Sequence, residues 1–404
     1  MRDIFLKLLY LALPLALLVS CSENGLPDDE GNDDEAKAGA RSTLLVYMMA
    51  ENNLDSFAKK DLAEIFLAAK DVPADCDMLV FLDGISTPCI LRYYAEKGKS
   101  ACDTVYRFKN DFYSSDAKEL QGVLDYIFEE YPTESLNLVL WSHGSGWMKF
   151  NKAKSRSIGY DNGENSPSFS LPSKSCIDIK DLAKVLGGLS VPIEYLMFDA
   201  CLMQCIEVVY DLRYCCKYIL ASPAEIPANG APYDRMIKEF FKAQIDPYAL
   251  MMSYADGYPT TRGVLLSVIE CVQIDQFAET MGGFVPKYFN AENKIKTSNL
   301  FVYLNRNYKT MPEFFDMNGV AKNVFAPEDY EVWKSSLDKM IVCSFAADSW
   351  ETMYSSSYVA TTDRAQFCGV SMYLPIEDSK HSSFNDDFVT IDWYKVANWD
   401  IAGW

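Results

Sequence analysis

The sequence is short of basic residues and of histidine, and it lacks a C-x-x-C pair. It holds 37 Lys and Arg against 57 Asp and Glu, which gives a formal net charge of −20. Because binding to nucleic acid needs clustered Lys and Arg, this balance argues against a nucleic acid as partner. Only two histidines occur and no C-x-x-C pair does, so the spacing gives no support to a zinc site. The sequence contains no internal repeat.

The N-terminus lacks an apolar run long enough to cross a bilayer. The apolar stretch 8–19 has twelve residues and follows two basic ones, so residues 1–20 fit a signal peptide. The stretch ends in Leu-Val-Ser-Cys, which resembles the lipobox of bacterial lipoproteins, and we expect lipid on Cys21. A plain secretory signal with a chance cysteine is the alternative. Residues 21–42 are acidic and nearly free of apolar side chains, as in a flexible tether.

These features predict an exported bacterial lipoprotein that is membrane-anchored through its N-terminal lipid, in the periplasm or at the cell surface. The sequence has twelve cysteines, and lipidation of one leaves an odd number. An odd number in an exported protein indicates at least one free thiol. Cys76, Cys89 and Cys102 lie close enough in the sequence to pair with one another.

Residues 43–404 have the pattern of a globular α/β domain, in which continuously apolar runs alternate with segments of helical period. This alternation indicates a mostly parallel sheet with helices on both faces. Strands are expected at 44–50, 77–84, 136–142, 193–200 and 217–222, a hairpin at 90–94 and 104–108, and helices at 54–70, 116–131, 178–186 and 202–212. The C-terminal additions would be a strand at 261–270, a helix at 274–285, a strand at 367–374 and an aromatic-rich closing helix at 390–404.

Two of the predicted core strands end in reactive side chains. The apolar run in LNLVLWSHGSGW ends at His143. The apolar run in IEYLMFDAC leads into Asp199-Ala200-Cys201. Carboxyl ends of parallel strands share one edge of a sheet, so neighbouring strands would bring His143 and Cys201 close together. A lone histidine is usually packed or solvated, and a lone buried cysteine is usually inert. Their pairing at two strand ends instead favours an imidazole that serves as base for a thiol.

The surroundings of this pair are expected to assist it. Cys201 directly precedes the predicted helix 202–212, whose positive end would favour the thiolate. Gly144 would leave room for a substrate backbone, and the N–H groups of Gly144 and Cys201 would form an oxyanion hole. Cys205 has no matching histidine and is expected in the core.

LWSHGSGW, followed some sixty residues later by FDACLMQCIEVVYDL, resembles the clostripain family of cysteine peptidases, which has a caspase-like α/β fold. SPAEIPANGAPY, GVSMYLP and DWYKVANWD resemble further segments of that family. The resemblance covers 43–404. It implies a cysteine endopeptidase with His143 and Cys201 as catalytic dyad. It also places Asp199 in the primary specificity pocket, where an acidic side chain selects Arg or Lys before the cleaved bond.

The resemblance has one departure in the loop after the fifth strand. Several relatives carry an acidic residue there, whereas this sequence has Asn229, with Glu225 nearby. Asp199, Glu225 and Asn229 are therefore the expected substrate-binding residues. The expected partners are protein or peptide substrates with basic residues.

Two other functions fit part of the pattern. A serine hydrolase would use Ser145, but a G-x-S-x-G elbow needs glycine where His143 stands. A catalytically silent surface lipoprotein that binds peptides or glycans would keep the fold without a competent dyad. The expected chemistry requires no cofactor. Calcium is possible, because GYDNGENS (159–166) offers oxygen ligands, although without EF-hand spacing.

A basic segment follows the histidine motif directly. KFNKAKSRS (149–157) concentrates positive charge in an acidic chain and has no apolar period, so we expect an exposed loop. A peptidase selective for basic residues would meet this loop at high effective concentration. Members of the clostripain family are matured by cleavage in the corresponding linker. Self-cleavage after Lys152, Lys154 or Arg156 and a merely solvated loop are the two interpretations.

Overall fold

The computed structural model describes residues 39–148, 157–163, 175–290, 296–303, 314–352, 357–361, 363–376 and 382–404. They belong to one unit, Ala38–Trp404. The expected signal peptide, Cys21 and most of the tether lie outside the described residues. Residues just before the predicted boundary at 42 already belong to the fold, because Ala40 pairs with Thr133. No helix among the described residues is long and apolar enough to cross a membrane.

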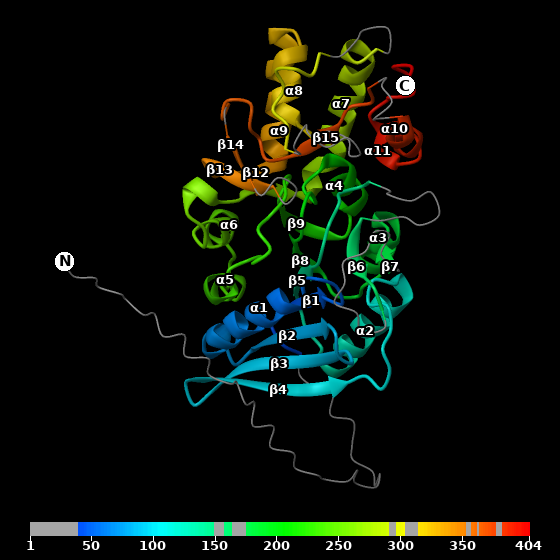
Figure 1. The fold of residues 1–404 in the computed structure, drawn as a ribbon. Helices are drawn as coiled ribbons and strands as arrows, with labels where there is room; N and C mark the ends of the chain where they lie inside the picture. The colour runs from blue at the N-terminus through cyan, green and yellow to red at the C-terminus, as the bar shows by residue number, and fades with distance from the viewer. Residues whose placement is uncertain are drawn as a thin grey trace, which may run out of the picture. The chain divides into compact units, whose positions relative to one another are not determined.

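A nine-stranded sheet forms the centre of this unit (Figure 1). Its order is β12 (Ile341–Ala346), β10 (Leu265–Glu270), β9 (Cys216–Ala221), β8 (Ile193–Asp199), β5 (Leu136–Trp141), β1 (Ser42–Met49), β2 (Cys76–Asp83), β3 (Cys89–Glu96) and β4 (Lys99–Arg107). The strands from β9 to β2 run parallel, and the outer strands pair antiparallel at both edges. The predicted mostly parallel sheet is thus confirmed.

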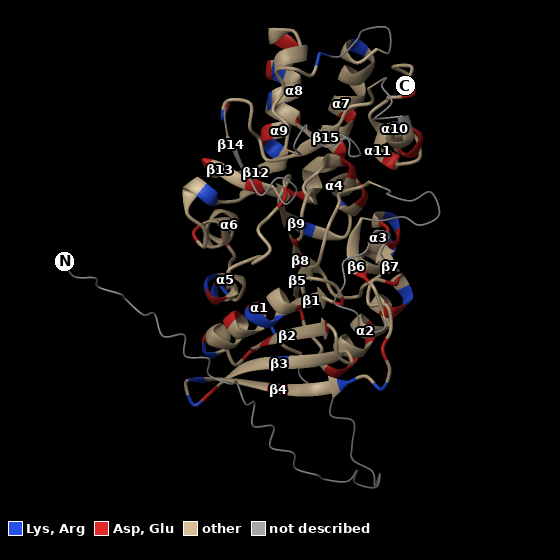
Figure 2. Cartoon of the chain, viewed as in Figure 1, with Lys and Arg blue, Asp and Glu red and all other residues tan. Residues whose placement is uncertain are grey.

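Helices cover both faces of the sheet because its inner strands are apolar on both sides. Leu44, Val46 and Met48 of β1 belong to the core shared with α1 (Asp55–Ala68), α5 (Tyr233–Phe240) and α6 (Pro247–Ala255). Alternate residues of the same strand face the opposite core. That core includes α2 (Ala117–Glu130), α3 (Ile179–Gly187), α4 (Ile206–Leu212), α7 (Ile274–Tyr288) and α9 (Pro327–Met340). Figure 2 shows charged residues on outward surfaces of helices such as α1, α5 and α9.

The C-terminal part departs from the prediction. The run expected as a strand at 367–374 contributes only β15 (Ser371–Tyr373), which pairs with β11 (Phe314–Asp316) outside the main sheet. The closing segment forms only a short helix, α11 (Asp392–Val396), followed by turns that bury Trp399. The remaining elements are η1 (Ala69–Asp71), β6 (Ile158–Asp161), β7 (Ser175–Ile177), η2 (Thr260–Arg262), η3 (Cys271–Gln273), α8 (Met317–Val324), β13 (Ser349–Thr352), β14 (Ser357–Ala360) and α10 (Ser382–Phe388).

The helix predicted from residue 202 begins only at Ile206. Leu202 has φ of 64°, in the left-handed region that a helix cannot contain. The N–H of Leu202 donates to Ala224 O at 2.9 Å and that of Gln204 to Ser222 O at 3.0 Å. Residues 201–205 therefore bond sideways to the loop after β9 instead of forming a first helical turn.

Candidate active site

The two predicted catalytic strands are direct neighbours. β5 and β8 run parallel, with Trp141 opposite Asp199 in the register. His143 and Cys201 each follow two residues later, and the N–H of Ser142 bonds to Asp199 O at 3.4 Å. Both side chains therefore leave the sheet at the same step beyond its carboxyl edge.

The backbones of the two motifs touch at Gly144. A Cβ atom at this position would lie 2.6 Å from Cys201 O and 3.0 Å from the Cβ of Ala200. Any side chain at position 144 would clash with the carbonyl group of Cys201, so only glycine fits there. Gly144 and Cys201 are partly exposed, whereas their neighbours His143 and Ala200 are buried. Within the described residues, neither the N–H of Gly144 nor that of Cys201 donates a hydrogen bond.

His143 is held from two sides. Its Nε2 lies 2.8 Å from Oδ1 of Asn53, which follows β1, and its ring packs edge-on against Tyr160, with centroids 5.6 Å apart. An amide oxygen only accepts, so Nε2 carries hydrogen and Nδ1 has the lone pair that can take a proton. Burial lowers the pKa of His143 to about 4, so the imidazole is neutral at physiological pH.

The thiol of Cys201 lies under the loop 222–231. Its sulfur accepts from the N–H of Ile226 at 3.4 Å. Burial, followed by the charge of Glu225, raises the pKa of Cys201 to about 12. The expected help from a helix dipole is wrong for this structure, because α4 starts at Ile206 and not beside Cys201. The resting group is a neutral thiol.

Asp199 is buried, and its carboxylate is surrounded by hydrogen-bond donors. One carboxylate oxygen accepts from the N–H of Ala231 at 2.9 Å and from the hydroxyl of Tyr233 at 3.0 Å, and the other accepts from Tyr254 at 3.0 Å. Gly230 has φ of 63°, and a Cβ there would lie 2.7 Å from the same carboxylate. Burial raises the pKa of Asp199 even though three hydrogen bonds oppose the shift.

Two further acids on α1, which the sequence analysis missed, interact electrostatically with Asp199. Asp61 accepts from the indole N–H of Trp141 at 2.7 Å, and Glu64 from the N–H of Tyr233 at 3.1 Å. Burial and the charge of Asp199 raise the pKa of Asp61 to about 9. Of the other predicted substrate residues, Glu225 is buried near the thiol and Asn229 is exposed on the loop. The spacing of Asp61 and Glu64, one helical turn apart, is the sequence signal that could have found them.

A second cluster of acids lies at the same edge of the sheet. Glu51, Asp83 and Asp161 are each completely buried, and one ligand oxygen from each lies within 4.8 Å of the others. Sequence analysis singled out only the segment that contains Asp161.

Cys205 is fully buried, as predicted, and Ser145 is buried too. All cysteines from Cys76 onward are free thiols, so the pairing considered among Cys76, Cys89 and Cys102 does not occur. The basic stretch 149–156 with Lys152, Lys154 and Arg156 lies outside the described residues.

Comparison with known proteins gives a consistent result. The chain resembles a secreted C11 cysteine protease from Bacteroides thetaiotaomicron, solved with an irreversible peptide inhibitor, at a TM-score of 0.77 and 26% identity over 90% of this chain and 99% of the other. It also resembles an inactive zymogen C11 protease from Parabacteroides distasonis, at a TM-score of 0.75 and 25% identity over 89% and 99%. The fold is therefore the caspase-like α/β fold of these proteases.

The curated relative and the family model agree with the structures. Clostripain of Hathewaya histolytica is 25% identical in an alignment of 231 positions that covers 48% of this chain and 41% of that protein. The chain thus spans less than half the length of this relative. Residues 46–404 match the model of the clostripain family, Peptidase_C11. Since this match covers nearly all of the folded unit, the chain belongs to the clostripain family of cysteine peptidases.

Proposed function

We propose that the chain is a cysteine endopeptidase in which Cys201 is the nucleophile and His143 the general base and acid. The observation that carries the proposal is the meeting of the two motifs on neighbouring parallel strands, where Gly144 lies against the Cys201 carbonyl. A thiol needs such a base to attack a peptide carbonyl at neutral pH. Membership of the clostripain family supports the reaction class.

The proposed reaction starts from an uncharged pair. With a thiol pKa of about 12 and an imidazole pKa of about 4, Cys201 and His143 are both neutral at rest. Nδ1 of His143 takes the thiol proton while the sulfur attacks the scissile carbonyl, and then gives that proton to the departing amine. Water hydrolyses the resulting thioester with His143 as base, which regenerates the thiol.

The oxyanion of each tetrahedral intermediate would be bound by backbone groups. The N–H groups of Gly144 and Cys201 are suited to this role, because both residues are partly exposed and neither N–H is engaged within the described chain. Donors of this kind stabilise charge only as it develops in the transition state, which raises kcat.

Selectivity for Arg or Lys before the cleaved bond would come from Asp199. Its carboxylate is buried, so a guanidinium or ammonium group would pair strongly with it. The raised pKa of Asp61, about 9, keeps that carboxyl group protonated at neutral pH in the free chain, and a bound cation would favour its ionised form. Glu225 and Asn229 belong to the loop that bonds both to Cys201 and to the strand end at Asp199, so they would border the substrate.

Self-cleavage after Lys152, Lys154 or Arg156 is the proposed route to the active form. The N–H of Ser145 bonds to Ser157 O at 2.9 Å and that of Gly159 to His143 O at 3.2 Å, so described residues before and after the segment 149–156 bond to one another at the histidine. A cut within it would leave both new ends attached to the fold. The high thiol pKa of the uncut chain suits a latent form, and a structural neighbour is described as an inactive zymogen.

The proposed location is the outside of the cytoplasmic membrane, with lipid on Cys21. The Leu-Val-Ser-Cys sequence supports this, and a structural neighbour is described as secreted. Metabolic labelling with a palmitate analogue should tag the wild-type chain and not Cys21→Ser. Equal labelling of the two chains would contradict lipidation at Cys21.

The deciding experiment for the peptidase is a digest of an unbiased peptide library. Wild-type chain should cut after Arg and Lys, whereas Cys201→Ala should cut nothing. On a denaturing gel, wild type alone should give two fragments, with the break after Lys152, Lys154 or Arg156. A single intact chain that still cleaves peptides would overturn self-cleavage. An intact chain that binds peptides or glycans and cleaves none would support the catalytically silent alternative.

A further inference from the structure

Two thiols meet at the amino end of β9, the end remote from the proposed catalytic pair. Cys216 is the first residue of β9, where it lies opposite Ile193 at the start of β8, and Cys271 directly follows β10. β9 and β10 are antiparallel neighbours with Tyr218 opposite Glu270, which brings both cysteines to the same end of the strand pair. Their Sγ atoms lie 3.7 Å apart, in contact with each other.

Other thiols near these two strands contact backbone groups instead. The sulfur of Cys201 accepts a backbone hydrogen bond at 3.4 Å. Cys215 is the immediate neighbour of Cys216 in the sequence, but its thiol donates to Ala183 O of α3 at 3.4 Å. The two adjacent cysteines therefore have different partners, and it is Cys216 that meets Cys271.

The position of the pair suits a covalent bond between the sulfurs. Neighbouring strands lie about 5 Å apart, and disulfides join residues whose Cα atoms are about 4.4–6.8 Å apart. The sulfurs need to approach by about 1.7 Å to reach the length of a disulfide bond, a change that side-chain rotation can supply. Cys216 is partly exposed and Cys271 is buried, so an oxidant would reach Cys216 first.

We propose that Cys216 and Cys271 form a disulfide in the exported protein. Disulfides form and persist outside the cytoplasm, so this step rests on the proposed location. The thiol of Cys216 would react with a disulfide oxidant, RSSR, to give a mixed disulfide and one RSH. The thiol of Cys271 would then displace the second RSH. The two cysteines lose two electrons and two protons, and the oxidant takes up both.

The bond would close a loop between positions 55 residues apart, and this loop contains much of the substrate side of the site. It includes the segment 222–231, whose backbone bonds to Cys201 and to Asp199. It also includes Ser267, whose carbonyl accepts from the side chain of Gln204 at 2.9 Å. A cross-link restricts the unfolded chain more than the folded one. The disulfide would thus stabilise the fold around the site and leave the proposed nucleophile free.

The direct test is to map the bond in the chain as cells export it. The Cys201→Ala chain is alkylated in denaturant without reductant and digested with trypsin. The peptide 214–217 should be joined to the peptide 263–287 and should separate from it on reduction. Because 214–217 contains both Cys215 and Cys216, the digest is repeated on two variants. Cys215→Ser should keep the link, and Cys216→Ser should lose it.

Two results of this mapping would overturn the proposal. One is a free thiol at both Cys216 and Cys271 in the exported chain, whether or not the pair oxidises in the test tube. The other is a link that Cys215→Ser abolishes and Cys216→Ser retains.

Thermal unfolding measures the effect on stability. In a buffer of glutathione and its disulfide, the Cys201→Ala chain should melt about 5 °C higher than in dithiothreitol. With Cys216→Ser or Cys271→Ser added, the melting temperature should be the same in both buffers, whatever damage the substitution does to the fold. Cys343→Ala, at a partly buried cysteine on β12 beside β10, should keep the full shift. Equal melting temperatures of the parent chain in its linked and reduced forms would overturn the stabilising role.

Peptide cleavage gives a readout that rests on the proposed function. Exported wild type and Cys216→Ser should cleave equally at first. After heating to a temperature between their melting points, wild type should retain about fivefold more activity. Equal losses would show that the bond does not protect the site. A chain that carries the disulfide and cleaves no peptide would sink the proposed peptidase and leave the disulfide standing.

Discussion

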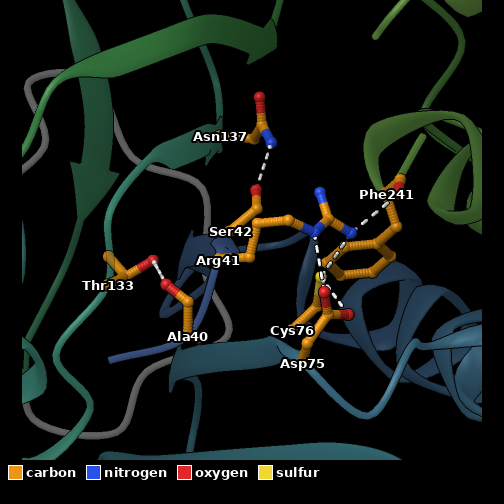
Figure 3. Close-up of polar contacts among 8 residues, drawn as sticks. All are labelled: Ala40, Arg41, Ser42, Asp75, Cys76, Thr133, Asn137 and Phe241. Carbon is orange, nitrogen blue, oxygen red and sulfur yellow. Dashed lines mark hydrogen bonds and ion pairs between the residues drawn. The ribbon is translucent and has the colours of Figure 1, made fainter. Parts of the chain in front are cut away.

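The two ends of the same parallel strands differ in the chemistry of their polar groups. At the amino ends of β1 and β2, Arg41 donates to Asp75 at 2.8 Å, to the sulfur of Cys76 at 3.0 Å and to Phe241 O at 3.3 Å (Figure 3). Asn137 of β5 donates to the hydroxyl of Ser42 at 3.2 Å. Each of these donors meets an acceptor, and the contacts join the strands to one another and to the segment after α5.

At the carboxyl ends, the same strands lead into buried ionisable groups. β1 and β2 lead to buried Glu51 and Asp83, and β5 and β8 to a neutral imidazole and a neutral thiol. The pKa of every one of Asp83, His143 and Cys201 is displaced by burial. Perturbed titrations of this kind gather where a protein does chemistry. The amino edge therefore holds the sheet together, and the carboxyl edge is where reactivity would be placed.

Removal of the thiol tests this contrast with the largest expected effect. Cys201→Ala should lower the cleavage of Arg and Lys peptides by at least about a thousandfold, because no other group can form the acyl-enzyme. The melting temperature should stay within a few degrees of wild type. Cys102→Ala, a partly buried cysteine on β4, is the matched control and should cleave normally. Substantial residual activity in Cys201→Ala would mean that the nucleophile lies elsewhere.

Neutralisation of the Asp199 carboxylate should have the next largest effect. Asp199→Asn should lower kcat/KM for arginine substrates about a hundredfold, since loss of one member of a desolvated charge pair costs about 2–5 kcal/mol. Alkylation of Cys201 by iodoacetamide should change little, because the thiol itself is untouched. A citrulline substrate, with the shape of arginine and no charge, gives the control: wild type should disfavour it and the variant should not. If both enzymes treat the two substrates alike, Asp199 does not set the selectivity.

Substitution of Asn53 should have a smaller effect, and it tests whether Asn53 positions His143 or only stabilises the fold. Asn53→Ala removes the contact to His143 Nε2 and should lower kcat about tenfold with little change in KM. Because Asn53 is exposed, stability should hardly change. Asn53→Asp keeps an acceptor and adds a charge that favours imidazolium, so activity should persist while its acid limb moves to higher pH. An unchanged pH profile in Asn53→Asp would place Asn53 outside the site.

The contrast between the edges also explains what the sequence could and could not reveal. Strands 44–50, 136–142 and 193–200 were predictable because a strand buried on both faces is apolar at every position. Neighbouring strand ends then placed His143 and Cys201 together without further information. Asn53 was missed because an exposed amide in a polar loop follows no hydrophobic period. The start of α4 was missed because Leu202 and Gln204 bond to a loop about twenty residues away, which no local pattern records.

The acid trio could not be recognised from spacing for a related reason. Glu51, Asp83 and Asp161 come from three separate strand ends, and only the fold brings them within 4.8 Å. The available signal was positional, since each acid ends a strand or follows one within two residues, although β6, which ends in Asp161, belongs to a separate two-stranded sheet. Treating every polar residue at the carboxyl ends of the predicted core strands as a candidate would have found Glu51 and Asp83, and Asn53 with them.

A substitution at the amino edge should have the smallest effect, and it should change stability and not cleavage. Arg41→Met removes the contacts to Asp75, Cys76 and Phe241 O and keeps the aliphatic part of the side chain. Because the pair with Asp75 is largely exposed, the melting temperature should fall by about 2 °C or less, and kcat and KM should stay at wild-type values.

The same pair should make stability depend on pH. Arg41 lowers the pKa of Asp75, so the stabilisation from this pair is present above the ordinary carboxyl pKa and is lost as pH falls through the lowered one. Wild type and Arg41→Met should therefore differ in stability at neutral pH and converge in acid, and thermal unfolding from pH 7 to pH 2 measures this. A drop in cleavage without a drop in stability would show that the two edges are not separate in role.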